Sequence, residues 1–307
     1  MRCRGLSLGL QRVLTDFGAE SGFARAVAQV WEHYGVAVNA SAVREATLRH
    51  GAEMARSQAE AAQLRRGGVA QVVAEMDGSM IPLVRLKPGR GDARKRRAVE
   101  WREARLCLAR AAGRVERRYG ACLGSVAEAG EQWRRAVVLA GGGRATQVHG
   151  VGDGAVWISR QCAAQFGAQG HYLVDFYHVS EYLSAAGRAL GQGREWLSVQ
   201  QERLKRNELE KVLGDLRERS EVSEVRVCLG YLEERREQLD YARALAMGLP
   251  IGSGEIESSH RHVLQARLKQ SGGWWSESGA RAMLGLRVER ANEGWEEYWA
   301  EQKRQAL

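Results

Sequence analysis

The sequence predicts an α/β protein with a mixed sheet flanked by helices. Two observations carry this prediction. Short apolar runs of strand length alternate with amphipathic helical segments between residues 69 and 180. The segments on either side of this region show helical spacing and no strand pattern. The chain therefore divides into an N-terminal helical region (1–68), a first core segment (69–180), a helical insertion (181–249) and a second core segment (250–307).

Composition and charge narrow the function classes. Lys and Arg number 46 against 37 Asp and Glu, and the resulting net charge of +9 favours a polyanionic partner. The apolar runs fall well short of the roughly 20 residues that a membrane span needs. The N-terminus also lacks the apolar core of a signal peptide, so we expect a cytoplasmic protein without a membrane partner. The five cysteines are scattered without a C-x-x-C pair, which argues against a zinc ribbon or a disulfide framework.

Residues 1–68 have the spacing of two helices joined by a short turn. Apolar residues recur at helical intervals from Phe23 onwards, Gly35 interrupts the pattern, and Ser41 has the chemistry of an N-cap for the second helix. This is the spacing of a helix-turn-helix, whose second helix would present Arg44, Thr47 and Arg49 to a DNA major groove. An ordinary helical hairpin fits the segment equally well.

The first core segment opens with strands. The run GGVAQVVAEMDG predicts a strand that ends at Asp77-Gly78, and two more strand-like runs occupy 103–113 and 119–129. Between them, residues 85–97 combine seven basic residues with Pro and Gly, which predicts a loop. The loop is either a solvated surface turn or a phosphate contact, and the basic character of the chain favours the second.

The rest of this segment reads helix, strand, helix, strand. The helix EQWRRAVVLA precedes a strand in TQVHGVGDGA, and a helix around VWISRQCAAQF precedes a strand at 171–179. Three meandering strands followed by two helix-strand units give the element order of a ribonuclease-H-like core. Residues 181–249 are helical and heavily charged, and form an all-α insertion. Residues 250–307 return to apolar helical spacing and carry Glu257.

Three carboxylates at ends of elements are candidates for metal-dependent chemistry. Asp77 ends the first strand and Asp153 ends the fourth, although Asp-Gly is also a common turn pair. Asp175, in the D-x-x-H pair with His178, is a rival for the second position. The strand order favours Asp153, because the first and fourth strands are neighbours in the expected arrangement. His178 would orient a phosphate or bond to Asp175.

The third carboxylate, Glu257, lies in the first turns of a basic helix. Ser253 has the chemistry of its N-cap, and the helix dipole favours a carboxylate there. Glu255 lies two residues away and points to a different side, so Glu257 is preferred. His260 and Arg261 share the face of Glu257.

Cations and an aromatic pair follow on the same segment. Arg261, Arg267 and Lys269 are suited to contacts with a phosphate backbone. Trp274 would stack on an unpaired base, whereas core packing of Trp274, Trp275 or both is the more common role of an indole ring.

Five motifs together carry a resemblance to a known family. They are DG at 77–78, GDGAVWI at 152–158, DFYHVSEYL at 175–183, PIGSGEIESSHRHVLQARLKQSGGWW at 250–275 and GARAMLGLR at 279–287. The chain resembles the DDE transposases of Kra-type bacterial insertion sequences, distant relatives of the mutator-like transposases. The resemblance runs from about residue 20 to 290. Relatives look longer at the N-terminus, with a cysteine-bearing segment, so an N-terminally shortened copy is expected.

The resemblance implies a DNA transposase that cleaves and rejoins insertion-sequence ends. It implies Asp77, Asp153 and Glu257 as ligands of two Mg²⁺ ions, for which Mn²⁺ would substitute, and Asp175 with His178 as an auxiliary pair. The implied partners are terminal inverted repeats and target DNA, bound by a homodimer or higher oligomer near the bacterial nucleoid. A nuclease that cuts without joining and an idle DNA-binding remnant are the alternatives.

Overall fold

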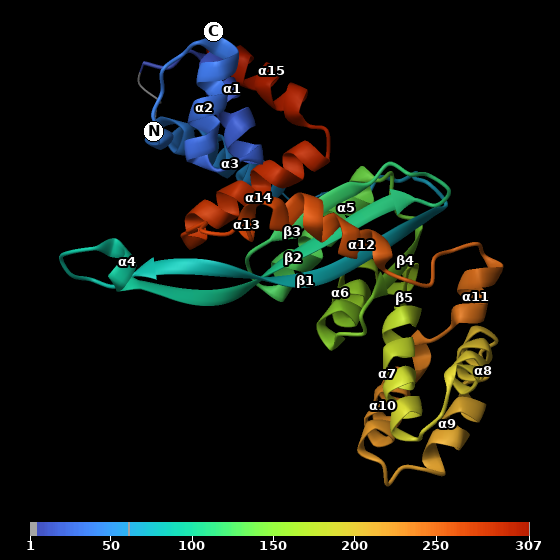
Figure 1. Cartoon of the computed structure of the whole chain (residues 1–307). Coiled ribbons are helices and arrows are strands. Elements are labelled where there is room, and N and C mark those ends of the chain that lie inside the picture. The colour runs from blue at the N-terminus through green and yellow to red at the C-terminus, as the bar shows by residue number, and fades with distance from the viewer. Residues whose placement is uncertain (1–4, 61, 307) are drawn as a thin grey trace.

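The computed structural model describes residues 5–60 and 62–306, and its architecture is an α/β fold around one mixed sheet (Figure 1). The strand order is β3-β2-β1-β4-β5. β1 pairs antiparallel with β2, and β2 pairs antiparallel with β3, whereas β1, β4 and β5 run parallel. The predicted α/β class and mixed sheet are confirmed. The strands are β1 Gln71–Leu86, β2 Arg97–Ala111, β3 Arg118–Cys122, β4 Gln147–Gly152 and β5 Gly170–Val174.

The first strand is longer than the sequence predicts. The expectation that it ends at Asp77-Gly78 is wrong, because β1 continues to Leu86 and stays in register with β2 from Val72↔Ala111 to Leu86↔Arg97. Ile81 and Leu83 are buried in the same apolar cluster as residues of the C-terminal helices, and this burial extends the strand. Gly78 makes no turn; a Cβ there would meet a Glu103 carboxylate oxygen at 2.3 Å, so the glycine permits close approach across the hairpin.

The tip of the β1–β2 hairpin holds the basic stretch. The expected loop at 85–97 contains one helical turn, α4 Ala93–Arg96, which begins where the Asp92 carboxylate accepts the Arg94 N–H at 2.8 Å. The third predicted strand, 119–129, ends at Cys122 because Ser125 and Glu128 form a capping box that starts α5.

Helices cover both faces of the sheet. On one face α5 Val126–Leu139 and α6 Val156–Phe166 pack around the fully buried Trp133. On the other face Ile256, Val263 and Val288 pack against Leu106 and Leu108 of β2. The elements that supply this second layer are α12 Gly254–Ser259, a π-helical segment His260–Gln265, α13 Ala266–Leu268 and α14 Glu277–Ala291.

The insertion is all-helical, as predicted, but it begins earlier than expected. The run 171–179 is not one strand, because β5 ends at Val174 and α7 begins at Phe176. The insertion projects from the β5 edge of the sheet, at the bottom of Figure 1, and its apolar core also includes Val73 of β1 and Leu173 and Val174 of β5. The insertion also touches the end of β4, since the Tyr231 hydroxyl donates to the Asp153 carbonyl at 2.8 Å. Its helices are α7 Phe176–Ala189, α8 Arg194–Lys205, α9 Leu209–Arg217, α10 Ser223–Glu234 and α11 Tyr241–Ala246.

The N-terminal helices α1 Leu8–Glu20, α2 Phe23–Tyr34 and α3 Ala40–Gln58 pack together with α14 and α15 Trp295–Ala306 (Figure 1). Gly35 ends α2 in the left-handed region, as the sequence predicts. The N-cap of α3 is Asn39, whose side chain accepts the Ala42 N–H at 2.8 Å, so the expectation of Ser41 is wrong.

Close packing of α3 against α14 places α3 at the centre of the group formed by the N-terminal helices, α14 and α15. A Cβ at Gly51 would meet the Ala282 carbonyl oxygen at 2.3 Å, so the backbones of α3 and α14 are nearly in contact. The long second helix of the predicted helix-turn-helix is therefore buried on this side by the C-terminal part of the chain.

Two further observations concern membrane-spanning helices and cysteine pairing. Of the helices in the part of the chain described here, none has both the length and the apolarity to cross a membrane. Cys107, Cys122, Cys162 and Cys228 are free thiols, and Cys3 lies outside the described residues.

Candidate active site

Asp77 on β1 and Asp153, the residue that follows β4, lie equally far beyond the last paired residues of these neighbouring parallel strands. The β1–β4 register pairs Glu75 with Val151, and two further residues along each chain lead to Asp77 and Asp153. The chains stay close there, because a Cβ at Gly152 would stand 3.3 Å from the Met76 carbonyl oxygen. Both aspartates are partly exposed. The arrangement gives two carboxylates at one end of the parallel strands, where α/β sheets carry their ligands.

Each aspartate uses one oxygen locally. Asp77 Oδ1 accepts the N–H of Gly78 at 2.7 Å, and Asp153 Oδ1 accepts the N–H of Ala155 at 2.8 Å. The other Asp77 oxygen, Oδ2, lies 3.2 Å from Nε2 of His260. These backbone bonds fix the orientation of both carboxylates and leave an oxygen of each for other contacts.

The helix that carries Glu257 is held against β1 by a buried carboxyl group. The Ile256 N–H donates to Glu75 Oε2 at 2.8 Å, and Glu75 is fully buried. Burial raises the pKa of Glu75 to about 8, so it is protonated at neutral pH. Our sequence reading missed Glu75, although a single carboxylate inside the apolar run VVAEM was a usable signal.

Glu257 itself is exposed on α12. His260 follows it by three residues, the spacing that places two side chains on one face of a helix. Since His260 meets Asp77, that face of the segment is turned toward the aspartate end of the sheet. The contact brings Glu257 and Asp77 to the same region of the molecule.

Glu255 has a different environment, as expected from its spacing. Its carboxylate bonds to Arg110 Nε at 2.9 Å and to Arg117 Nε at 2.5 Å. Burial alone would raise the pKa of Glu255, but the two arginine hydrogen bonds hold the pKa below its usual value. Glu255 therefore serves as an ion-pair anchor between α12 and β2.

Asp175, the rival for the second position, is a buried helix cap. Its Oδ1 accepts the N–H groups of Tyr177 at 2.6 Å and His178 at 3.1 Å. Its Oδ2 accepts the Ser253 N–H at 2.6 Å and the Ser253 hydroxyl at 2.5 Å, and only 3% of the residue is exposed. The expectation that Ser253 caps its own helix is therefore wrong, because its hydroxyl is committed to Asp175.

His178 lies in the first turn of α7, just beyond β5, with a half-exposed imidazole. Its Nδ1 lies 3.7 Å from Glu181 Oε2, and its ring packs edge-on against Tyr182 and Tyr231. The imidazole makes no bond to Asp175; only the backbone N–H of His178 does. The alternative in which the ring is bonded to Asp175 is thus wrong.

The site offers the right donor type for a hard divalent cation but is not preassembled. Within the described ranges, no three His, Cys, Asp or Glu side chains are grouped closely enough to hold a metal ion. Carboxylate oxygens are the ligands that Mg²⁺ prefers, and Asp77, Asp153 and Glu257 supply only oxygens. The three residues fit magnesium by the chemistry of their donor atoms.

The expected DNA-facing residues of α3 fall into two groups. Arg44 is exposed. Thr47 is fully buried and its hydroxyl donates to the Val43 carbonyl at 2.7 Å, while Arg49 is half-buried and bonds to Gln11 and His50. The expectation that Thr47 and Arg49 point toward a major groove is wrong, because both lie on the face of α3 that packs against α1 and α15.

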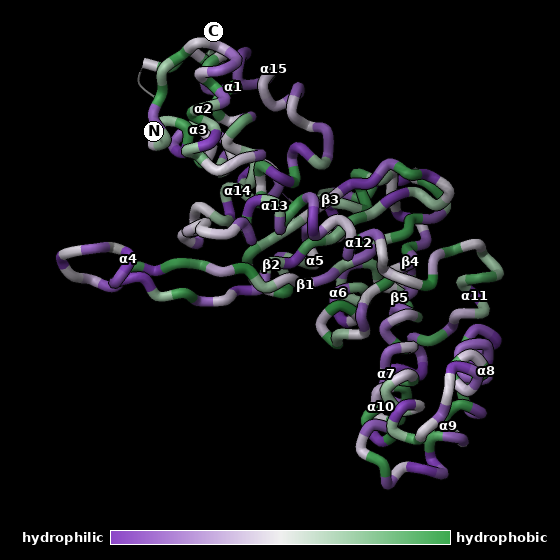
Figure 2. Tube along the Cα trace, viewed as in Figure 1, coloured by the Kyte–Doolittle hydropathy of each residue, from purple (hydrophilic) through white to green (hydrophobic). Residues whose placement is uncertain are grey.

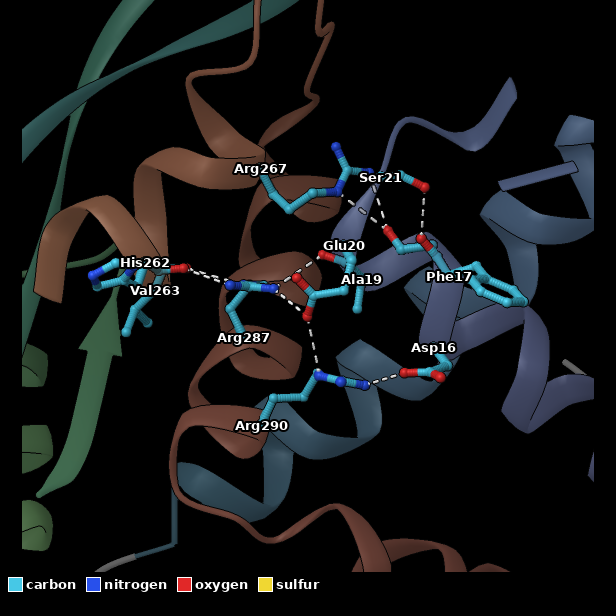
Figure 3. A network of polar contacts seen from close by, with 11 residues as sticks. Asp16, Phe17, Ala19, Glu20, Ser21, His262, Val263, Arg267, Arg287 and Arg290 are labelled. Carbon is cyan, nitrogen blue, oxygen red and sulfur yellow. Dashed lines mark hydrogen bonds and ion pairs between the residues drawn. The ribbon is translucent and has the colours of Figure 1, made fainter. Parts of the chain in front are cut away.

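Arg267 is also turned inward, as Figure 3 shows. It is 2% exposed, and its guanidinium donates twice to the Gly18 carbonyl near the end of α1, at 3.1 and 3.2 Å. Burial lowers the pKa of Arg267 to about 10, which still leaves it charged. The expectation of a DNA contact is wrong for this residue. Arg287 and Arg290 extend the same network to Glu20 and Asp16.

The remaining candidates are accessible. Arg261 and Lys269 are exposed on the segment after Glu257. Trp274 is 40% exposed and the Arg97 guanidinium stands over its ring at 5.1 Å, whereas Trp275 is buried and its Nε1–H donates to the Arg267 carbonyl at 3.2 Å. The tryptophan pair is thus divided between surface and core.

Comparison with known proteins gives a family without an assigned activity. No curated protein matches the chain. The model of the family described as "Uncharacterised protein family (UPF0236)" matches residues 19–304, nearly the whole chain. The chain is a member of this family.

Proposed function

We propose that this protein is a DDE-type DNA transposase with a ribonuclease-H-like catalytic core, which cleaves and rejoins the ends of an insertion sequence. One observation carries the proposal. Asp77 and Asp153 each lie two residues beyond the last β1–β4 register pair, Glu75↔Val151, and His260, three residues after Glu257, stands 3.2 Å from Asp77. The strand order, with three antiparallel strands extended by two parallel ones, supports the same core.

The proposed ligands are Asp77, Asp153 and Glu257, which would hold two Mg²⁺ ions, or Mn²⁺ in their place. When bound, such a pair of cations stabilises the attacking and leaving oxygens of an in-line phosphodiester displacement. The protein orients two of the carboxylates through the N–H groups of Gly78 and Ala155. The hydrogen bond from the Ile256 N–H to Glu75 holds the helix of the third carboxylate against β1.

The proposed substrate is DNA, both terminal inverted repeats and target. The net charge of +9 supports a polyanionic partner. Arg261 and Lys269 are exposed cations on the segment that follows Glu257, and Arg44 is an exposed cation on α3. Exposed Trp274 offers an aromatic face for an unpaired base. We propose a location at the bacterial nucleoid on the same grounds.

A strand-transfer assay tests this function. The probe is labelled DNA from both flanks of the gene, incubated with the full chain, a plasmid target and Mg²⁺. We expect cleaved ends and joined products, and Asp77→Asn, Asp153→Asn and Glu257→Gln should each lose both while retaining DNA binding. Asp92→Asn, an exposed carboxylate at the hairpin tip, is the matched control and should keep full activity.

Three outcomes would count against the proposal. Cleavage without joining would indicate a nuclease. DNA binding without either product would indicate a remnant that only binds. Cleavage that survives in Asp153→Asn would remove Asp153 from the ligand set.

A further inference from the structure

The outer half of the β1–β2 hairpin, residues 80–103, projects from the body of the protein as an arm (Figure 1). β3 pairs with β2 only from Arg105 to Ala109. Residues 97–103 of β2 therefore lie beyond the last strand, and within the described part of the chain no strand pairs with their outer edge.

The hydrogen bonds of the arm fix which backbone groups face outward. Lys87 N–H donates to the Arg96 carbonyl, and Val84 N–H points away from β2 to the Trp275 carbonyl, both at 2.8 Å. The pair Val84↔Val99 is therefore a non-hydrogen-bonded pair. It follows that Val99 and its alternate neighbours turn their N–H and C=O groups to the free edge; they are Arg97, Val99, Trp101 and Glu103.

The β1 edge of the arm is blocked from further strand pairing, whereas the β2 edge is not. On the β1 side, Pro82 lacks an N–H at an outward position, and the Trp275 segment covers Val84. Native proteins commonly protect edge strands with proline, a bulge, charged side chains or a covering segment. On the β2 side, residues 97–103 contain no Pro or Gly and pair with β1 without interruption. This edge keeps free backbone groups for strand pairing, and its four charged residues require a partner of complementary charge.

One face of the arm carries four exposed apolar side chains. Trp101 is 57% exposed, Val99 51%, Leu86 53% and Met80 46%, and cross-strand pairing puts all four on the same face. The hydropathy colouring in Figure 2 shows apolar segments along both strands of the arm. An exposed apolar face beside an open edge is typical of an interaction surface.

The sequence of the edge is complementary to itself. In antiparallel pairing about Glu100, Arg97 lies opposite Glu103 and Val99 lies opposite Trp101. The outward backbone groups of all four residues then form hydrogen bonds with the same groups of the other copy. The facing side chains are either of opposite charge or both apolar. Pairing about Trp101 instead would set Arg97 opposite Arg105, a like charge whose backbone is already bonded to β3.

The centre of this arrangement places two copies of Glu100 opposite each other. Arg85 and Arg102 of the same chain already pair with the Glu100 carboxylate, at 3.2 and 2.5 Å. Two carboxylates would therefore be surrounded by four guanidinium groups, which offsets their mutual repulsion.

We propose that residues 97–103 of β2 pair antiparallel with the same residues of a second copy, forming a two-fold dimer whose axis passes at Glu100. We choose a second copy of this chain as the partner because antiparallel self-pairing sets Arg97 of each copy opposite Glu103 of the other. The proposal does not depend on the catalytic function, since it rests only on the arm.

Cross-linking tests the register. Residue 100 would face itself in a non-hydrogen-bonded pair, with Cα atoms about 4.5 Å apart, within the range of a disulfide. Glu100→Cys should give a covalent dimer under mild oxidation. Arg102→Cys should not give a covalent dimer. In this register residue 102 of one copy lies opposite residue 98 of the other, so the two cysteines are four residues apart along the strand. A cross-link in Arg102→Cys but not in Glu100→Cys would overturn the register, and no cross-link in either would overturn the pairing.

Charge exchange tests the partner. By light scattering after size exclusion, the unmodified chain should be dimeric, whereas Arg97→Glu and Glu103→Arg should each be monomeric because like charges face each other. An equimolar mixture of the two variants should restore a dimer that contains one chain of each. Circular dichroism should show both variants folded. A monomeric unmodified chain, dimers in both single variants, or no recovery in the mixture would each refute the proposal.

Discussion

Asp77 and His260 meet between the sheet and the helical layer, with Asp77 Oδ2 3.2 Å from His260 Nε2. His260 is 3% exposed and begins the π-helical segment that follows α12. Such segments occur often at functional sites, because the wider turn redirects a side chain. We infer from this proximity that His260 positions Asp77, a proposed metal ligand.

His260→Phe should keep the buried ring and remove the contact with Asp77. We expect the Mg²⁺ concentration needed for half-maximal cleavage to rise about 10- to 100-fold, the usual effect of losing a partner of a metal ligand. His262→Phe is the control, since His262 is exposed two residues further on. An unchanged Mg²⁺ dependence in His260→Phe would mean that the histidine only packs.

Asp175→Asn should affect stability, whereas Asp153→Asn should affect chemistry. The buried Asp175 carboxylate accepts four hydrogen bonds, so we expect the free energy of unfolding to fall by about 1–3 kcal/mol. For the partly exposed Asp153 we expect a change of about 0.5 kcal/mol or less. Urea unfolding followed by circular dichroism measures both, and the reverse ranking would contradict the assignment of Asp175 as a structural cap.

Arg267 and Lys269 provide a matched pair for separating folding from DNA binding. Arg267→Met removes buried bonds to the Gly18 carbonyl and should destabilise the protein by about 2 kcal/mol or more, without changing the salt dependence of DNA binding. Lys269→Ala should leave stability unchanged and reduce the slope of log affinity against log salt by about 1. Equal salt slopes for all three proteins would exclude Lys269 as a phosphate contact.

His50 should make the protein less stable in mild acid. Burial and the nearby Arg49 charge lower the pKa of His50 to about 3. Tyr298 donates its hydroxyl to Glu53 and so accepts from His50 Nδ1, which leaves Nε2 as the acceptor for Arg49, as in a neutral ring.

Below pH 6.5 the unfolded chain protonates His50 and the folded chain does not, so the stabilising contribution is complete above pH 6.5 and is lost as the pH falls toward about 3. The slope is at most about 1.4 kcal/mol per pH unit. His50→Gln should remove this component, which thermal unfolding between pH 4 and 7 would detect as a flatter stability profile. If the stability of His50→Gln changed with pH as steeply as that of the unmodified chain, the predicted contribution of His50 would be refuted.

The sequence predicted the element order of the sheet because periodicity reports local structure. It placed Asp153 after β4 and the insertion between β5 and Glu257. The prediction was wrong where contacts with residues far away in the sequence determine the structure. Gly78 looks like a turn signal, but burial of Ile81 and Leu83 against C-terminal helices keeps β1 extended. Arg267 looks like a surface cation, but the Gly18 carbonyl binds it in the core.

The same limit applied to the carboxylates. Helical spacing predicted that Glu255 and Glu257 point to different sides, and Glu255 indeed pairs with Arg110 whereas Glu257 is exposed. Asp153 and Asp175 both follow apolar runs, and only the bonds from Ser253, 78 residues away, show that Asp175 is occupied. A buried acid such as Glu75 could be noticed in the sequence, but its partner Ile256 could not.

The near contact between α3 and α14 has a consequence for the order in which the protein is made. The backbone of α3 at Gly51 fits against Ala282, more than 200 residues later in the chain. During translation the first helices leave the ribosome long before the surface they pack on exists. A ribosome that stops before α14 therefore releases a chain in which the buried faces of α1 and α3 stay exposed, a substrate for chaperones and proteases.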